Sequence, residues 1–133
     1  MRRDTKLLSS TSTELARLTQ IDYEREMVFI AEGTGPDCHP RTLGTVRSAA
    51  DPDNRDAEFG IIVRSDLKGR GLGTLLMQEL IRHARERGTQ RLVATVLREN
   101  QGMLALANEC GFTVGTTLRA GEGDTREIWL ALA

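Results

Sequence analysis

A glycine-rich turn is the segment of this sequence best suited to chemistry. Three glycines fall within residues 69–73, after an apolar run at 59–63 and before a helical pattern at 75–87. A strand, a glycine-rich turn and a helix together point backbone N–H groups toward a phosphate, and glycine lets the backbone approach without Cβ interference. Lys68 and Arg70 add positive charge there. The sequence therefore predicts a site for a phosphate-bearing ligand.

Length and composition bound the remaining possibilities. The chain has 133 residues, of which 39% are hydrophobic and 28% charged, as expected for one domain over 1–133 with an N-terminal arm at 1–20. The net charge of −1 gives no support for nucleic acid or a membrane surface as a partner. No apolar run approaches the roughly 20 residues of a membrane span, and no signal peptide follows the charged N-terminus, so a cytoplasmic protein is expected. Cys38 and Cys110 form no metal-binding pattern, and we expect no metal.

The pattern of apolar and turn residues predicts an α+β fold, in which helices pack on a mixed sheet. The expected strands are 27–31, 43–49, 57–63, 91–97, 112–116 and 127–132, and the expected helices are 12–19, 75–87 and 102–109. The first helix rests on a capping-box spacing at residues 11–14, and residues 1–10 are expected to be frayed. The first three strands read as antiparallel hairpins. His83, on the second helix, is expected to face solvent.

Three kinds of phosphate loop can be compared with this turn. The kinase-type loop needs Lys followed by Ser or Thr after its last glycine, which is lacking here. The dinucleotide fingerprint needs a glycine where Leu76 stands and a parallel lead-in. Residues 68–73, Lys-Gly-Arg-Gly-Leu-Gly, instead resemble the Gln/Arg-x-x-Gly-x-Gly/Ala signature of the GNAT superfamily of N-acetyltransferases. Lys68 is a conservative departure from that signature.

The resemblance extends over most of the chain, from about residue 27 to 132. Asn100, a small-residue helix and Gly111-Phe112 follow in the family's order. Residues 21–27, 57–59 and 63–69 look like the GNAT domain of bacterial protein lysine acetyltransferases, which is commonly fused to an acyl-CoA-synthetase-like region. The resemblance implies a GNAT fold, acetyl-CoA as co-substrate and a protein lysine as acceptor, with an acyl-CoA synthetase as one candidate. Small-molecule amine acetylation and a non-catalytic acyl-CoA-binding regulatory role remain the alternatives.

The residues suggest roles for acetyl transfer from a thioester to an amine. Glu58, which alternates onto one face of its strand with Gly60 and Ile62, is our candidate general base. Asp56 and Glu32 are rivals, and a structural ion pair is the plain alternative for Glu58. The resemblance implies that main-chain N–H groups near Ile61 and Ile62 polarise the thioester. The expected cofactor-binding residues are Ile61, Ile62, Val63, Lys68, Gly69, Arg70, Gly71, Leu72, Gly73, Thr74 and Asn100; for Asn100 a helix N-cap is the alternative.

Two departures from the family pattern bear on function. The family often has a tyrosine as general acid in the helix after the asparagine, and Ala107 stands there. The family also opens with a strand and one or two helices before the strand matched by 27–31, but only about 26 residues precede that strand, with no convincing first strand. We therefore expect a shortened N-terminal region with an open sheet edge. An open edge invites pairing, which predicts a homodimer or an exchanged N-terminal arm.

Overall fold

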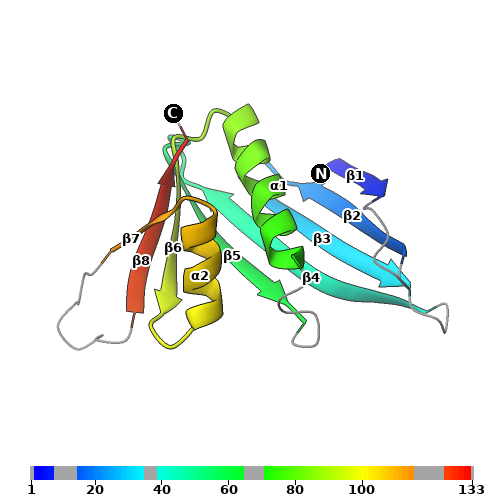
Figure 1. Cartoon of the computed structure of the whole chain (residues 1–133). Coiled ribbons are helices and arrows are strands. Elements are labelled where there is room, and N and C mark those ends of the chain that lie inside the picture. Colours follow the sequence, from blue (N-terminus) through cyan, green and yellow to red (C-terminus); the bar gives the residue numbers. More distant parts are fainter. Residues whose placement is uncertain (1, 8–14, 35–38, 65–70, 116–124, 133) are drawn as a thin grey trace.

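The computed structural model describes residues 2–7, 15–34, 39–64, 71–115 and 125–132. In this part of the chain, eight strands form one mixed sheet in the order β1-β2-β3-β4-β5-β6-β8-β7 (Figure 1). The elements are β1 (Arg2–Leu7), β2 (Leu15–Asp22), β3 (Glu26–Thr34), β4 (Pro40–Ala50), β5 (Asp56–Val63), α1 (Leu72–Glu86), β6 (Arg91–Leu97), α2 (Gln101–Glu109), β7 (Thr113–Val114) and β8 (Thr125–Ala131). The predicted α+β class, with a mixed sheet and packed helices, is confirmed.

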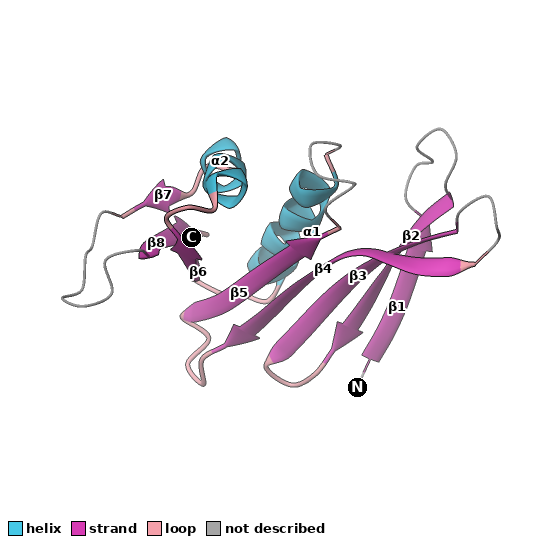
Figure 2. Cartoon of the chain, turned by 90° about the horizontal axis from the view of Figure 1, so that it is seen from below, coloured by secondary structure: helices cyan, strands magenta, loops and turns pink. Residues whose placement is uncertain are grey.

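One face of the sheet carries the core. Phe29, Val46 and Ile61 lie beside one another across β3, β4 and β5, and α1 packs over these strands. The side chains of α1 that are buried there are Leu76, Met77, Leu80, His83 and Ala84. The helix α2 lies on the same side of the sheet as α1, as the view from below shows (Figure 2). Residues of opposite parity point the other way, because successive side chains of a strand alternate between faces.

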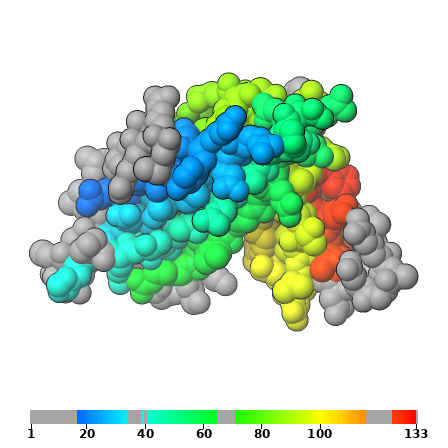
Figure 3. Space-filling model, turned by 180° about the vertical axis from the view of Figure 1, so that it is seen from behind, coloured from blue at the N-terminus to red at the C-terminus, as the bar shows by residue number. Residues whose placement is uncertain are grey.

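The opposite face of the sheet is covered by no helix of the described residues, and we call it the helix-free face. In β5 it carries Glu58, Gly60 and Ile62, which are all exposed, whereas Ala57 and Phe59 are buried on the other side. The predicted alternation of Glu58 with Gly60 and Ile62 is thus confirmed. Figure 3 views the molecule from this side, where the strands themselves form the surface.

The N-terminal residues differ from the expectation. Residues 15–22 form β2, so the helix predicted at 12–19 is wrong over 15–19, and residues 2–7 form β1 where a frayed arm was expected. Antiparallel pairing of β2 with β3 places Leu18, 2% exposed, opposite Ala31 in the core. The capping box at 11–14 lies outside the described residues. A local helix signal loses to strand pairing here because pairing fills the edge of β3 and buries Leu18.

The connection between β2 and β3 is short. Residues 23–25 join the two strands, and Tyr23 N–H donates to the Glu26 carbonyl at 2.7 Å. No helix therefore separates β2 from β3, in agreement with a shortened N-terminal region. The open edge expected at 27–31 is wrong, however, because β2 covers β3 and β1 covers β2. An open edge at β3 therefore no longer supports a homodimer or an exchanged arm. Both stay predictions, which light scattering would test.

Most other boundaries agree with the pattern. The strand predicted at 91–97 is β6, and the helix predicted at 75–87 begins slightly earlier, at Leu72. Of the strand predicted at 112–116, the structure has Thr113–Val114 as β7, and residue 116 lies outside the described residues. Among the described helices, none has the length and apolar character needed to cross a membrane.

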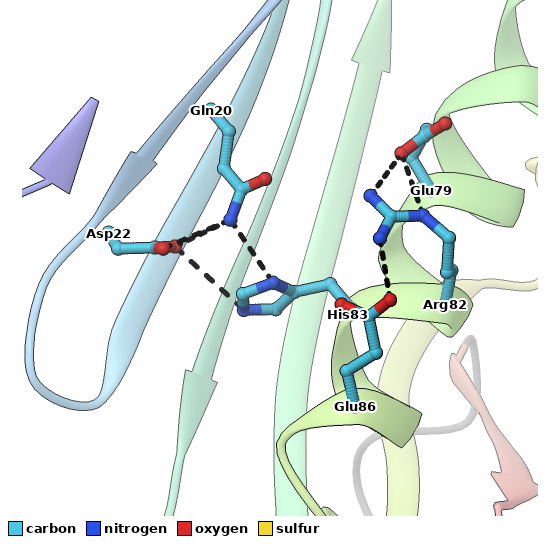
Figure 4. A network of polar contacts seen from close by, with 6 residues as sticks. All are labelled: Gln20, Asp22, Glu79, Arg82, His83 and Glu86. Carbon is cyan, nitrogen blue, oxygen red and sulfur yellow. Dashed lines mark hydrogen bonds and ion pairs between the residues drawn. The ribbon is translucent and has the colours of Figure 1, made fainter. Parts of the chain in front are cut away.

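A polar network joins α1 to β2 (Figure 4). His83 was expected in solvent but is 8% exposed, and its ring meets Phe29 edge-on at 5.8 Å. Gln20 Nε2 lies 3.2 Å from His83 Nδ1 and also donates to Asp22. Burial lowers the pKa of His83 below its ordinary value of 6.5; Asp22 and Glu86 act against this, whereas Arg87 and Arg82 add to it.

This burial predicts a pH-dependent stability. The unfolded chain takes up a proton near pH 6.5, but folded His83 does so only at lower pH. The contribution of neutral His83 to the free energy of unfolding should therefore be fully present above pH 6.5 and should be lost as the pH drops toward the folded pKa. Urea unfolding measured from about pH 7.5 to about pH 5 should show this loss, and His83→Leu should flatten it. The matched control is His39→Gln, which changes an exposed histidine. An unchanged slope in His83→Leu would contradict the prediction.

Candidate active site

The site is built around a place where the sheet opens. β5 pairs with β4 along residues 57–63, but with β6 only at residues 56–58, which lie beside residues 91–93. Beyond Glu58 and Val93 the two parallel strands separate, and we call the opening between them the fork (Figure 1). Main-chain groups of β5 that face the fork lie outside the ladder with β6. Backbone N–H and C=O groups require partners, and a bound ligand can supply them.

A cavity of about 610 Å³ opens at the fork on the side of the helices, and we call it the α1–α2 cavity. Its size is that of a small-molecule site. Seven of the predicted cofactor-binding residues line it: Ile61, Ile62, Val63, Gly71, Gly73, Thr74 and Asn100. Sequence reasoning missed five more: Gly102, Met103, Ala105, Leu106 and Glu109. The spacing of 102, 106 and 109 indicates one helix face, and this signal could have found them.

The start of α1 forms one wall of this cavity. Gly71 has a φ of +81°, a left-handed conformation that favours glycine, and its carbonyl accepts the Leu75 N–H at 3.0 Å. No side chain caps α1, and no acidic residue lies in its first turn. The N–H groups of residues 72–74 are therefore suited to an anion. Lys68, Gly69 and Arg70 were predicted to join this cradle and lie outside the described residues.

Two residues of the turn have separate structural roles. A Cβ at Gly73 would lie 3.2 Å from Leu106 Cδ2, so glycine lets α1 and α2 approach each other beside the cavity. Leu72 does not line the cavity. Its side chain packs against the core near Gly44, and only its main chain can contribute to the cradle.

The residues of α2 show what this wall can contribute. The Asn100 side chain accepts the Met103 N–H at 3.1 Å, which makes it the N-cap of α2, and Asn100 also lines the cavity. Ala107 is fully buried, and its methyl side chain has no proton to donate. Burial raises the pKa of the partly buried Cys110 thiol, which keeps it protonated at neutral pH. Met103, Ala105 and Leu106 make much of the wall apolar, and Glu109 adds a carboxylate to it.

Glu58 lies at the base of the fork on the helix-free face. It is the last residue of β5 that pairs with β6, and its side chain is exposed. Beside it is a hollow of about 290 Å³, which Val93, Glu127 and Trp129 also line and which we call the Trp129 hollow. From behind, the molecular outline is notched between β5 and the end of β6 (Figure 3). The cavity thus adjoins residues 61–63 of β5, and the hollow adjoins Asp56 and Glu58 of the same strand.

The two rivals of Glu58 are placed less well. Asp56 accepts two hydrogen bonds from Arg91, at 3.0 and 2.8 Å, and this guanidinium holds the pKa of the Asp56 carboxyl below its ordinary value. Glu32 lies on β3, which β4 separates from β5. Of these three carboxylates, the geometry therefore favours Glu58, which lies at the base of the fork and whose side chain makes no ion pair with a described residue.

The described residues contain no cluster of three or more His, Cys, Asp or Glu side chains that could hold a metal ion. Cys38, of the Cys38-His39 pair, lies outside them, and His39 is exposed. The residues around the fork instead offer main-chain groups, a helix N-terminus and exposed carboxylates, with Glu58 at its base and Glu109 in the lining of the α1–α2 cavity. This set suits an organic phosphate-bearing ligand on one side and a basic group on the other.

Comparison with known proteins agrees with this geometry. The chain is 37% identical over 57 residues to an L-methionine sulfoximine/L-methionine sulfone acetyltransferase from Pseudomonas paraeruginosa. This match covers 43% of this chain and 33% of that protein. The chain is 32% identical over 113 residues to the acetyltransferase Pat of Mycolicibacterium smegmatis, covering 83% of this chain and 32% of Pat. The chain thus spans about a third of the length of these curated relatives.

Solved structures with a similar fold point to the same family. The crystal structure of the GNAT domain of S. lividans PAT superimposes with a TM-score of 0.69 at 25% identity, covering 84% of this chain and 64% of that one. The sequence model of the acetyltransferase (GNAT) family matches residues 4–112, which is most of the chain. With the glycine turn, the fork and the cavity in the places described, the chain belongs to the GNAT family of acetyltransferases.

Proposed function

We propose that this chain transfers an acetyl group from acetyl-CoA to the side-chain amine of a protein lysine, with Glu58 as general base. The fork is the observation that carries the proposal, because the exposed Glu58 carboxylate lies at its base and the α1–α2 cavity adjoins residues 61–63 of the same strand. Bound acetyl-CoA would supply a thioester whose acetyl carbon forms a bond to the amine nitrogen as the carbon–sulfur bond breaks and coenzyme A leaves as a thiol.

The residues of the chain would each support one part of this reaction. N–H groups at the start of α1 would hold the pyrophosphate, and the fork-facing main chain of residues 61–63 would hold the pantetheine arm. Main-chain N–H groups there would also stabilise negative charge developing on the carbonyl oxygen. Glu58 would take a proton from the ammonium, directly or through water, so that the nitrogen lone pair can attack. Since Ala107 offers no proton, water would protonate the departing sulfur, whose basicity is modest.

A protein acceptor is supported by the open surface around Glu58. Only three residues connect β2 and β3, where the family resemblance leads one to expect helices before the strand at 27–31, and no helix of the described residues covers the helix-free face. Glu58 therefore lies on a broad surface that a folded acceptor can approach. The resemblance of residues 21–27, 57–59 and 63–69 to the GNAT domain of bacterial protein lysine acetyltransferases points the same way. An acyl-CoA synthetase is the first acceptor to try.

A small-molecule amine is the second candidate acceptor, since the Pseudomonas relative is named for methionine sulfoximine and methionine sulfone. A thiol-release assay with acetyl-CoA would compare an acyl-CoA synthetase, a lysine peptide, spermidine and methionine sulfoximine. Acetylated lysine found by mass spectrometry would support the proposal. Transfer to a small amine alone would favour the second candidate, and binding of acetyl-CoA without any transfer would indicate a regulatory module.

Two glycines of α1 provide a matched test of the phosphate cradle. Gly71 and Gly88, at opposite ends of the helix, have φ values of +81° and +78°, and a Cβ at either would meet nothing within 4 Å. Alanine should therefore cost about 1 kcal/mol of stability at both positions. Only Gly71→Ala should also weaken acetyl-CoA binding, because Gly71 lies at the cradle. We expect a loss of about tenfold, which corresponds to one charge-assisted hydrogen bond to the pyrophosphate. Calorimetry and urea unfolding measure the two effects. Equal affinities in both variants would argue against the cradle.

Glu58→Gln tests the base. The amide cannot accept the proton, so turnover should fall about 100-fold. Affinity for acetyl-CoA should be unchanged, because Glu58 does not line the α1–α2 cavity. Glu24→Gln is the control, since Glu24 is exposed in the turn between β2 and β3. If Glu58→Gln turned over at the wild-type rate, Glu58 would not be the base.

A further inference from the structure

The Trp129 hollow contains side chains that the proposed reaction does not use. Strand register places Glu58, Val93 and Trp129 in one row across β5, β6 and β8 on the helix-free face. The next row along β6 and β8 is Thr95 with Glu127. Val93 thus forms an apolar floor, with Glu58 on one side and Trp129 on the other, and Glu127 lies one row further along β8.

The Trp129 ring is held in place by β7. A Cβ at Gly115 would lie 2.9 Å from Trp129 Cζ3, closer than such atoms approach, so only glycine lets the chain close against the ring. Gly115 N–H also donates to the Glu127 carbonyl at 2.7 Å. The same contact therefore fixes the backbone that carries Glu127 and Trp129.

Carboxylates outnumber cations among the side chains around the hollow. Asp56 and Arg91 are engaged with each other in a bidentate pair. The side chains of Glu58 and Glu127 are exposed, and neither makes a hydrogen bond or ion pair with a described residue, while the Glu127 charge acts on Arg91 from a distance. A cation that enters the hollow would find these two carboxylates, an aromatic ring and an apolar floor, beside the Asp56–Arg91 pair. Aromatic rings and carboxylates both attract ammonium groups, and an aliphatic stem can lie along apolar surface.

We propose that the Trp129 hollow selects an acceptor that arrives as an alkylammonium without a neighbouring carboxylate, and that Glu127 and Trp129 determine this specificity. This inference rests on the proposed function and names the chemistry of its acceptor. The stem of a lysine side chain would lie over Val93 and the Trp129 ring, with its ammonium between Glu58 and Glu127. A free amino acid would bring its own carboxylate next to the reacting amine, where Glu58 and Glu127 repel it. Such repulsion is an ordinary source of specificity.

The hollow contains its own probe, because Trp129 is the only tryptophan of the chain. Indole fluorescence would be titrated with Nα-acetyl-lysine methylamide, with its neutral isostere Nα-acetyl-norleucine methylamide and with spermidine, all in the presence of coenzyme A. The lysine compound should bind at least fivefold more tightly than the norleucine compound. Spermidine distinguishes a free polyamine from a peptide side chain as the source of the ammonium group. Equal affinities for the charged and neutral compounds would overturn the inference.

Two variants assign the effect to residues. Glu127→Gln should weaken the lysine compound about fivefold and leave the norleucine compound unaffected. In turnover, Glu127→Gln and Trp129→Phe should each raise KM for the lysine peptide several-fold, with the larger effect on KM than on kcat. Glu127→Gln should also improve use of methionine sulfoximine relative to lysine. Glu24→Gln is again the control.

The outcomes separate the two proposals. If the lysine compound binds and Glu127→Gln weakens it, but no acetyl group is transferred, then the proposed function fails and the inference stands. If lysine is acetylated and Glu127→Gln changes neither its KM nor its preference over methionine sulfoximine, then the inference fails and the function stands.

Discussion

The separation of β5 from β6 after Glu58 is the constraint on which the rest of this structure depends. A sheet that opens loses ladder hydrogen bonds, so the groups left along β5 must find other partners. The flanking elements keep the opening in place. β4 holds the far side of β5 through Val63, β8 holds β6 along its length, and α2 packs beside the start of α1. The separation of β5 from β6 is therefore fixed by the packing of the neighbouring strands and helices.

The N-terminal hairpin changes the surroundings of that gap without changing the gap itself. β2 and β1 extend the sheet beyond β3, where β2 supplies Leu18 to the core and Gln20 and Asp22 to the network around His83. The two faces of this part of the sheet have different roles. One completes the packing under α1, and the other enlarges the helix-free face on which Glu58 lies.

The sequence predicted what local patterns control. Helical spacing and the glycines at 71 and 88 locate α1, and an apolar run of the right length locates β6. The same reasoning gave a helix at 12–19, because a capping spacing is local and the edge of β3 that captures residues 15–22 is distant in sequence. His83 was misplaced for the same reason. Its neighbours Gln20 and Asp22 are some sixty residues away, and nothing near it shows that it is buried.

In the candidate site, too, residues close in sequence could be predicted together and residues brought together by the fold could not. Glu58 and the glycine turn are adjacent in sequence and were found together, whereas Glu127 and Trp129 were missed because only the strand order β5-β6-β8 brings them beside Glu58. That order also fixes the two approaches to the fork, with the α1–α2 cavity on the side of the helices and the Trp129 hollow on the other face. For the proposed transfer, two approaches let both substrates be held at once. Under the proposal, the two substrates would form a ternary complex with sequential kinetics, in which the acyl group passes directly between them and no residue of the protein has to carry it.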